Sequence, residues 1–484
     1  MPPTTRPAAV LLAAALLLSV SGCGAEEAGP SAVARGGSAA EAGAAGVARE
    51  GAPNVLLVVI DTLRADHLEL YAYERATAPR LAAMAAGGIT FDQAVSQAPT
   101  TVPSHATMFT GRYPRQHMTM SYRTPLPPAE VTLAELFGAH GWRTFGVAAS
   151  ERFDPGSGLR QGFETFDLTL ARGEANRSAE VTRLATEQID ADDGRPFFGF
   201  VHFMEPHSPY TPPADLVTRF HPGLDDLSPG DTGKYLRDHD HPEAEVSGEI
   251  VEWLEALYDA EILSLDEQLG ALFDLLDERG LAENTLVVLT SDHGEEFKEH
   301  GLFLHHQMHA ELLDVPLVFR WPARLTGGVH VARPVELAGL LPTLTDLLSL
   351  PTPEGVAGRS FAEHLLPGSA RPSPGRDAQR EALDRMDVVL AESGDNRWAV
   401  AATLPTGRFK LMYERGDRLM LFHLDDDPGE LADVRWAYPR ETGVLTELAA
   451  SIAPGGEAWE GVERVPDAAA REWLIELGYV EETR

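Results

Sequence analysis

Cysteine is almost absent from this 484-residue chain, in which Cys23 is the only one. A single thiol excludes an intramolecular disulfide. No cysteine after residue 23 is left to serve as a nucleophile or a metal ligand. Any reactive site in the rest of the chain must therefore be built from hydroxyl, carboxylate and imidazole groups.

Positive charge is scarce as well. The chain has 39 Lys and Arg residues against 74 Asp and Glu, which gives a formal net charge of −35 at pH 7. Because a phosphate backbone must be neutralised by cations, this balance argues against nucleic acid as a partner. It leaves room for a small anionic substrate, which responds to a local site rather than to the net charge.

The N-terminal apolar run, AAVLLAAALLLSV, is shorter than the ~20 residues that a spanning helix needs. It is followed by Val-Ser-Gly-Cys23, which resembles a bacterial lipobox. We therefore predict a lipoprotein signal peptide at residues 1–22 and lipidation of Cys23. The protein would be exported and lipid-anchored to a bacterial membrane on its extracytoplasmic side, without spanning it. The alternative is an ordinary signal peptide with an incidental cysteine.

Residues 23–52 are almost all Ala, Gly, Glu and Ser, with no large apolar side chain to bury. This composition predicts a flexible linker. The remaining length and the hydrophobic fraction of 44% are typical of a large globular domain with an appendage. We place a catalytic domain at residues 53–369 and a C-terminal subdomain at residues 370–484.

Strand and helix patterns alternate along residues 53–369. Continuous apolar runs predict strands that are buried on both faces, and helical spacing of apolar residues predicts helices between them. This alternation indicates an α/β fold with a doubly wound, mostly parallel sheet flanked by helices. The predicted strands are Asn54–Asp61, Thr144–Ala148, Pro196–Met204, Thr285–Gly294 and Val315–Pro322, and the predicted helices are Pro79–Ala86, Leu133–Ala139 and Glu249–Arg279.

The pattern changes after residue 370. A polar connector leads into four short strand-like stretches, DVVLAES, WAVAAT, GRFKLMYE and RLMLFHL, followed by a helical region. Short strands in succession favour an antiparallel sheet. The C-terminal part is therefore predicted to be a smaller α+β subdomain.

Several polar side chains come directly after the apolar strand runs: Asp61, Glu205, Asp292 and His293. In open α/β sheets, ligands bind beyond the carboxyl ends of the strands. These four groups are of metal-ligand type, so the sequence predicts a site at this edge of the sheet.

Four stretches carry a resemblance to a known family: NVLLVVIDTLRADHL, TTVPSHATMFTGRYP, MEPHSPYTPP and TSDHGEEFKEHGLFLHH. Together, and in this order, they resemble the sulfatase family of the alkaline phosphatase superfamily, over roughly Asn54 to Leu445. The resemblance implies a metal at the strand ends and a nucleophile at the N-terminus of a helix. It also implies that the C-terminal subdomain is part of the family's fold.

The nucleophile position departs from the family pattern. Sulfatases have C/S-x-P-x-R and oxidise the first residue to formylglycine, whereas this chain has Thr101-Val-Pro-Ser-His105. A threonine cannot give that aldehyde, because its β-carbon carries a methyl group. Threonine is instead the pattern of phospho-transferring relatives, such as nucleotide pyrophosphatases/phosphodiesterases and phosphoethanolamine transferases. The resemblance thus implies Thr101 as nucleophile and His105, in place of the arginine, as a substrate-binding residue. The alternative is that Thr101 or Ser104 merely caps a helix.

The resemblance implies one divalent ion held by Asp61, Thr101, Asp292 and His293. The imidazole favours zinc or manganese over calcium. The alternative for Asp61 and Asp292 is that each caps a following helix. A second ion is the less favoured arrangement, with ligands drawn from Glu205, His207, His305 and His306.

Two further histidines match substrate-contacting positions of the family. His207 is expected to contact the oxyanion, and His305 to stabilise or protonate the leaving group. His306 is an alternative to its neighbour and is also a substrate-binding candidate. Residues 208–247 are the insertion expected to shape specificity.

These features predict a metal-dependent hydrolase or transferase of phosphoric esters, phosphodiester or phosphonate, with a threonine nucleophile. The substrate would be a small molecule or a lipid or cell-wall ester. One alternative is a sulfuric ester hydrolase that works without formylglycine. Another is a catalytically inactive lipoprotein that binds an anion.

Overall fold

The structure is a computed structural model that describes residues 48, 51–169, 177–222, 232–368, 386–414 and 418–452. The predicted signal peptide, Cys23 and nearly all of the predicted linker lie outside these residues. Among the described helices, none is long and apolar enough to cross a membrane.

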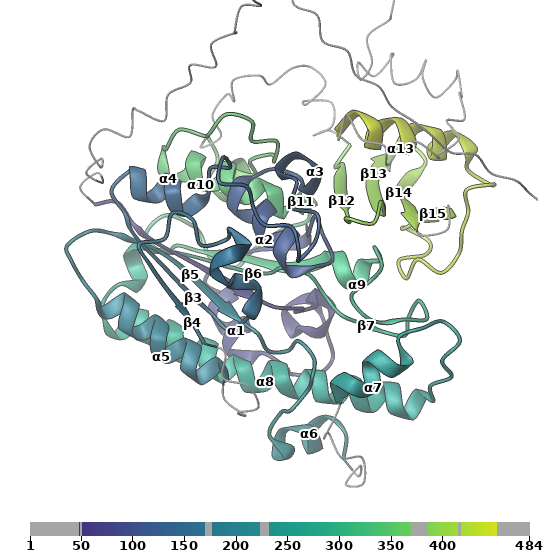
Figure 1. Cartoon of the computed structure of the whole chain (residues 1–484), viewed down its shortest axis with the longest axis horizontal. Helices are drawn as coiled ribbons and strands as arrows, with labels where there is room; N and C mark the ends of the chain where they lie inside the picture. Colours follow the sequence, from purple (N-terminus) through teal and green to yellow (C-terminus); the bar gives the residue numbers. More distant parts are fainter. Residues whose placement is uncertain are drawn as a thin grey trace, which may run out of the picture. The chain divides into compact units, whose positions relative to one another are not determined.

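A large mixed sheet forms the centre of the fold (Figure 1). Its strand order is β10-β2-β9-β6-β1-β5-β3-β4, with β11 paired to β2. All of these pairings are parallel except those of β9, which is antiparallel to both β2 and β6. The strands are β1 (Asn54–Ile60), β2 (Ile89–Val95), β3 (Arg143–Ala148), β4 (Thr165–Leu168), β5 (Phe197–Phe203), β6 (Thr285–Ser291), β9 (Asp314–Arg320), β10 (Val329–Val331) and β11 (Val335–Glu336).

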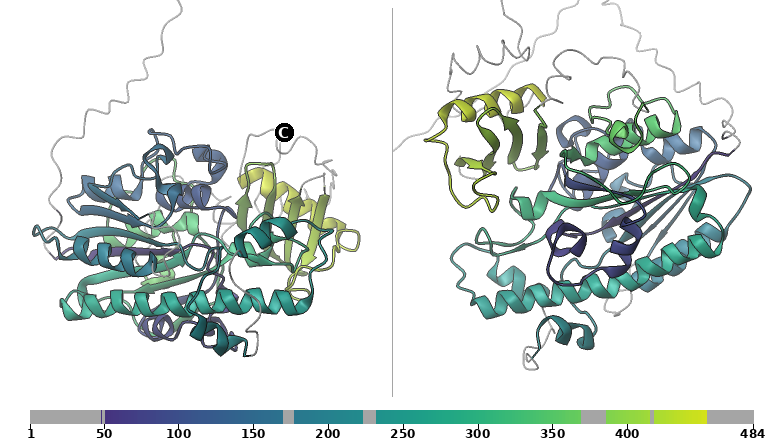
Figure 2. Two further views of the ribbon diagram at one scale, coloured as in Figure 1. Left: turned by 60° about the horizontal axis from the view of Figure 1, so that its bottom comes forward. Right: turned by 180° about the vertical axis from the view of Figure 1, so that it is seen from behind.

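Helices cover both faces of this sheet, and the two apolar cores follow from the alternation of side chains along the strands. In β1, Val55, Leu57 and Val59 pack into the core that holds α2 (Thr101–Thr110), α4 (Leu133–Ala139) and α10 (Leu340–Leu348). Leu56, Val58 and Ile60 pack into the core that holds α1 (Pro79–Ala85), α5 (Arg177–Asp190) and α8 (Gly248–Glu278). Figure 2 shows the long helix α8 running along one side of the sheet. The mostly parallel α/β fold is therefore confirmed.

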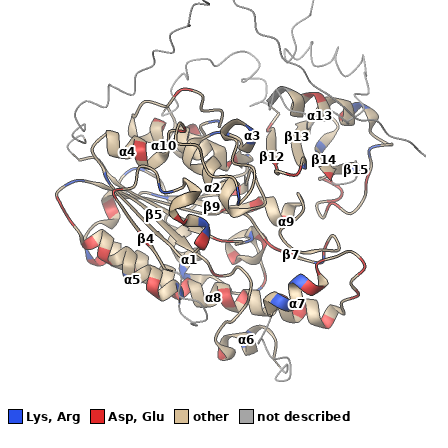
Figure 3. Ribbon diagram, in the orientation of Figure 1, with Lys and Arg blue, Asp and Glu red and all other residues tan. Residues whose placement is uncertain are grey.

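The other described elements are short or peripheral. Acidic side chains are spread along α5, α7 and α8 in Figure 3, in keeping with the net charge of −35. The remaining elements are α3 (Pro114–His117), α6 (Ala214–Phe220), α7 (Thr232–His239), α9 (Ala310–Leu313), α11 (Ala362–Leu365), β7 (Glu296–Phe297) and β8 (Phe303–Leu304).

The C-terminal subdomain contains the predicted antiparallel sheet, with strand order β12-β13-β14-β15, and a helix. Trp398 and Leu421 lie in a core that this sheet shares with the helix. Glu430 of the subdomain pairs with Lys410 at 2.7 Å, and the same carboxylate pairs at 2.8 Å with His309 of the larger domain, directly before α9. The elements are β12 (Val389–Glu392), β13 (Trp398–Leu404), β14 (Gly407–Glu414), β15 (Arg418–His423) and α13 (Pro439–Ile452).

The core beneath α2 gives a first testable prediction. Phe200 of β5 is fully buried, with its ring centroid 5.0 Å from Phe109 and 5.4 Å from Phe153. Phe200→Ala leaves a cavity among these rings, so we expect the free energy of unfolding to fall by about 3–5 kcal/mol. Urea unfolding measures the loss. Leu431→Ala, at a side chain that is 75% exposed, should change stability by less than about 0.5 kcal/mol. Equal losses in the two variants would contradict the packing described here.

Candidate metal centre and active site

Two neighbouring strands bring the first three candidate ligands together. In the parallel pairing of β1 and β6, Ile60 is opposite Ser291, so Asp61 and Asp292 follow at the same edge of the sheet. Both carboxylates and the His293 ring are buried. Nε2 of His293 lies 3.5 Å from Asp292 Oδ2 and 3.8 Å from Asp61 Oδ1. The predicted group of metal ligands therefore exists as a compact buried cluster.

The turn after β1 is held in a fixed, unusual conformation. Thr62 has φ 56°, a left-handed value that is uncommon for a β-branched residue. Its N–H donates to Asp292 Oδ1 at 3.2 Å, and its carbonyl accepts from the Tyr258 hydroxyl at 2.6 Å. Arg64 N–H donates to the same hydroxyl at 2.9 Å. These bonds orient the Asp292 carboxylate and hold the backbone that follows Asp61, and strained backbone of this kind is concentrated at functional sites.

Thr101 is the first residue of α2 and is nearly buried. Thr100 occupies the N-cap position, and in the described part of the chain its side chain makes no capping hydrogen bond. Ser104 does not cap the helix either: its hydroxyl donates to the carbonyl of Asp292 at 2.8 Å. The start of α2, with its free N–H groups, is thereby tied to the loop that carries the ligands.

His105 lies one turn further along α2 and is fully buried. Its Nδ1 donates to the carbonyl of Thr101 at 2.8 Å and lies 3.7 Å from Asp292 Oδ2. Burial lowers the pKa of His105 to about 3, and the nearby charge of His202 adds to this effect. The predicted contact of His105 with a substrate stays a prediction. The structure shows its ring against the candidate ligands.

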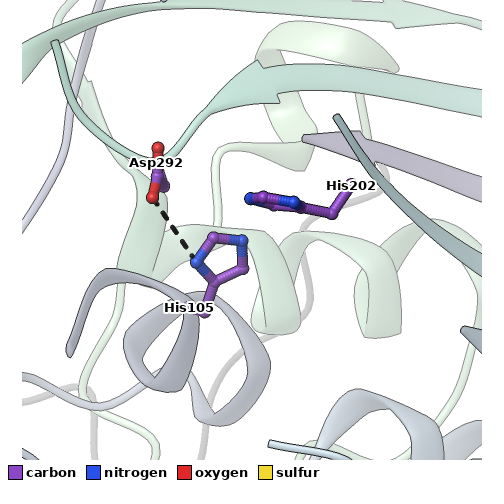
Figure 4. Close-up of side chains that lie close together, drawn as sticks. All are labelled: His105, His202 and Asp292. Carbon is purple, nitrogen blue, oxygen red and sulfur yellow. Dashed lines mark ion pairs between the residues drawn. The ribbon is translucent and has the colours of Figure 1, made fainter. Parts of the chain in front are cut away.

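His202 is a residue that sequence reasoning missed. It lies one residue before the carboxyl end of the buried strand β5, with its Nε2 3.5 Å from Asp61 Oδ2 and its ring centroid 5.2 Å from that of His105. Figure 4 shows His105, His202 and Asp292 close together, from α2, from β5 and from the residue directly after β6. The signal in the sequence was a single imidazole within the otherwise apolar run FFGFVHF.

The cluster leaves many buried polar atoms without hydrogen-bond partners among the described residues. They are both carboxylate oxygens of Asp61, Oδ2 of Asp292, Nε2 of His105 and of His293, and both ring nitrogens of His202. An unpaired buried polar group costs about 1–3 kcal/mol, so this concentration needs a common partner. A divalent cation satisfies such a donor set, and the residues present fit one.

The pKa shifts of the two carboxylates also favour a cation at this site. Burial, and then the neighbouring carboxylate of Asp61, raise the pKa of Asp292 above its usual range. Burial also acts to raise the pKa of Asp61, but the charges of His207 and of His202, whose Nε2 lies 3.5 Å from Asp61 Oδ2, outweigh it, so that pKa is lowered. Two carboxylates this close are stable together only when positive charge lies between or beside them.

His305 lies next to His293, and His207 lies next to His305. The ring centroid of His305 is 4.6 Å from that of His293 and 5.5 Å from that of His207. Burial acts to lower the pKa of His207, but the charges of Asp61 and then Glu295 outweigh it and raise that pKa. Burial and the charge of His293 lower the pKa of His305 well below its usual value.

The choice between the two adjacent histidines is clear in the geometry. His305 faces the cluster, whereas the His306 side chain is 49% exposed and pairs with Asp240 at 3.2 Å. Glu205 pairs with Arg177 at 3.4 Å. The described residues form two groups of three acid or imidazole side chains whose ligand atoms lie within 4.8 Å of one another. Neither group includes Glu205, His207, His305 or His306.

Comparison with known proteins places the chain in a family. Residues 53–350 match the family model described as Sulfatase. Arylsulfatase K of Bos taurus is 26% identical over 463 residues, which cover 83% of this chain and 82% of that protein. The family match confirms the resemblance drawn from the motifs, and enzymes of this family use a divalent metal.

Two solved structures share the fold. A phosphonate monoester hydrolase of Agrobacterium radiobacter aligns with a TM-score of 0.64 at 20% identity, over 88% of this chain and 95% of that one. A protein solved with its substrate D-glucosamine-2-N,6-O-disulfate aligns with a TM-score of 0.67 at 17% identity, over 86% of this chain and 100% of that one. Both likenesses confirm the fold, including the small C-terminal sheet.

Proposed function

Because the chain belongs to the sulfatase family of hydrolases, we propose that it cleaves phosphoric esters, phosphodiester or phosphonate monoester, with Thr101 as nucleophile. The observation that carries this proposal is the identity of Thr101 at the start of α2, the helix that Ser104 ties to Asp292 of the buried cluster of Asp61, Asp292 and His293. A threonine supplies a hydroxyl but no formylglycine aldehyde. Its chemistry therefore suits phosphoryl or phosphonyl transfer.

Asp61, Asp292 and His293, with the Thr101 hydroxyl, are the groups that would hold the catalytic cation. A bound divalent cation lowers the pKa of a coordinated hydroxyl and neutralises negative charge on a bound ester. Two hydrogen bonds keep these groups in position: the Thr62 N–H donates to the Asp292 carboxylate, and the Ser104 hydroxyl donates to the Asp292 carbonyl. The N-terminus of α2 adds free N–H groups for an oxyanion.

The histidines complete the reaction. Thr101 gives up its hydroxyl proton to water, its oxygen bonds to phosphorus, and the bond from phosphorus to the leaving oxygen breaks, with the electron pair departing on that oxygen. His207, whose pKa is raised by the charges of Asp61 and Glu295 despite its burial, is suited to contact the anionic oxygens. His305, whose pKa is lowered chiefly by burial, would donate an N–H to the leaving oxygen as a neutral ring. Water then releases the product from Thr101, whereas an acceptor alcohol in its place would make the protein a transferase.

A sulfuric ester is the second candidate substrate class. It is favoured by the relatives themselves, since arylsulfatase K and an ulvan-active sulfatase of Formosa agariphila are each 26% identical to this chain. Sulfate and phosphate esters share tetrahedral geometry, so the same anion-binding groups serve either. The two differ in the charge that the site must neutralise.

A panel of p-nitrophenyl esters separates the two classes. We expect kcat/KM for p-nitrophenyl phenylphosphonate or bis(p-nitrophenyl) phosphate to exceed that for p-nitrophenyl sulfate by roughly 100-fold or more. The assay uses purified protein loaded with zinc or manganese, and release of nitrophenolate is followed by absorbance. Turnover of the sulfate alone would overturn the phosphoric-ester proposal in favour of the second candidate.

A further inference from the structure

His105 and His202 form a pair of buried imidazoles that the proposed reaction does not use. Both residues are fully buried, although they come from different elements, α2 and β5. Nε2 of His105 and both ring nitrogens of His202 have no hydrogen-bond partner in the part of the chain that the structure describes. Each unpaired buried nitrogen costs about 1–3 kcal/mol, so two such rings side by side indicate a ligand that binds them.

The orientation of the His105 ring is that of a metal ligand. Its Nδ1 lies 2.8 Å from the carbonyl of Thr101, which can only accept a hydrogen bond, so this nitrogen carries the proton. The lone pair is therefore on Nε2. Histidines that bind metals regularly donate their other ring N–H to a backbone carbonyl in this way, which fixes both tautomer and orientation.

The third member of the group is Asp292. Its Oδ1 accepts from the N–H groups of Thr62 and His293, at 3.2 and 2.9 Å, while its Oδ2 has no partner among the described residues. One ring nitrogen of His105, one ring nitrogen of His202 and one carboxylate oxygen of Asp292 all lie within 4.8 Å of one another. The same is true of Asp61, Asp292 and His293, so one carboxylate belongs to both groups.

We propose that His105, His202 and Asp292 bind a second divalent cation beside the one assigned to Asp61, Asp292 and His293. The two sites would share the Asp292 carboxylate, as in carboxylate-bridged pairs about 3.5–4 Å apart. Asp61 is placed to contribute to both, because one of its oxygens faces His293 and the other faces His202. Two imidazoles and a carboxylate suit zinc or manganese rather than calcium.

This site differs from the second site considered from the sequence. That arrangement drew on Glu205, His207, His305 and His306, which form no compact group of ligands among the described residues. The new site lies on the α2 side, where the His105 N–H is bonded to the carbonyl of Thr101. A cation there would hold the first turn of α2, and with it the proposed nucleophile, against the carboxylates.

Metal stoichiometry tests the proposal directly. The full-length protein is freed of metal with a chelator, dialysed against Zn²⁺ and then against metal-free buffer, and its zinc content is measured by mass spectrometry. We expect two ions per chain in the wild type and one in His202→Phe, which keeps an aromatic ring of similar size among the surrounding phenylalanines. His305→Phe is the matched control, because it removes an imidazole next to His293, and it should retain two ions.

One ion per chain in the wild type would overturn the proposal, and so would two ions in both His202→Phe and His105→Phe. If these variants fail to fold, electron paramagnetic resonance of the manganese-loaded wild type tests the proposal instead. Two neighbouring ions give an exchange-coupled spectrum, which is the expected result. A spectrum of isolated ions would overturn the bridged site. Neither readout depends on turnover. If the protein does not cleave phosphoric esters, the metal count is unaffected. A failure of the proposed activity can therefore be distinguished from a failure of the second metal site.

Discussion

Thr101→Val is expected to lower kcat/KM for the preferred phosphoric ester by about 10³-fold or more, because it removes the proposed nucleophile. Valine replaces the hydroxyl with a methyl group of similar size and remains compatible with the first turn of α2. Thr101→Ser keeps a hydroxyl at the same place and should retain activity within about tenfold of the wild type. The contrast between these two variants isolates the hydroxyl from the packing of the side chain.

The covalent intermediate gives a second readout. Quenching the wild type during turnover of a slow phosphonate should yield an intact-mass increase of one phosphonyl group, located on Thr101 by peptide mapping. The adduct should be present in Thr101→Ser and absent in Thr101→Val. Thr101→Val with full activity would refute the nucleophile assignment. An adduct on another residue would transfer the role to that residue.

Much of the site could be predicted because its ligands follow strands that the sequence marks clearly. The run NVLLVVI is apolar at every position after the first, and TLVVLTS has four apolar residues in a row, which is typical of strands buried on both faces. Their pairing side by side puts Asp61 and Asp292 at one edge. The four C-terminal strands were predicted for a similar reason, since each short apolar stretch ends in turn residues.

The features that the sequence did not reveal depend on contacts between distant segments. His202 has no polar neighbour in its strand, and its importance appears only when α2 brings His105 to within 5.2 Å, centroid to centroid. Strand β2 was not predicted either, because Asp92 and Gln93 interrupt its apolar pattern where the strand bulges. The roles of His305 and His306 could not be separated by pattern, since adjacent residues share the same local sequence. Only Asp240, more than sixty positions away, shows which ring turns outward.

Removal of metal is the other change with a large expected effect. In the cluster of Asp61, Asp292 and His293, two buried carboxylates lie close together. Several of the cluster's oxygen and nitrogen atoms lack hydrogen-bond partners in the described chain. Without a cation, the proposed reaction loses the charge that activates Thr101, so we expect a chelator to lower activity by about 10³-fold or more. A ligand present at 100 times its dissociation constant stabilises the folded state by about 2.7 kcal/mol, so chelation should also lower Tm by several degrees.

Asp292→Asn provides the matched test of this stability effect. The substitution is nearly isosteric but removes the carboxylate common to both groups of ligands, so the variant should bind little metal and its Tm should not respond to the chelator. In the wild type, Zn²⁺ or Mn²⁺ added after chelation should restore both activity and Tm, as followed by nitrophenolate release and differential scanning calorimetry. A wild type with the same Tm and activity before and after chelation would contradict a catalytic cation at Asp61, Asp292 and His293. Equal shifts in the wild type and Asp292→Asn would instead locate the stabilising metal outside this cluster, because only the wild type keeps the carboxylate on which both groups depend.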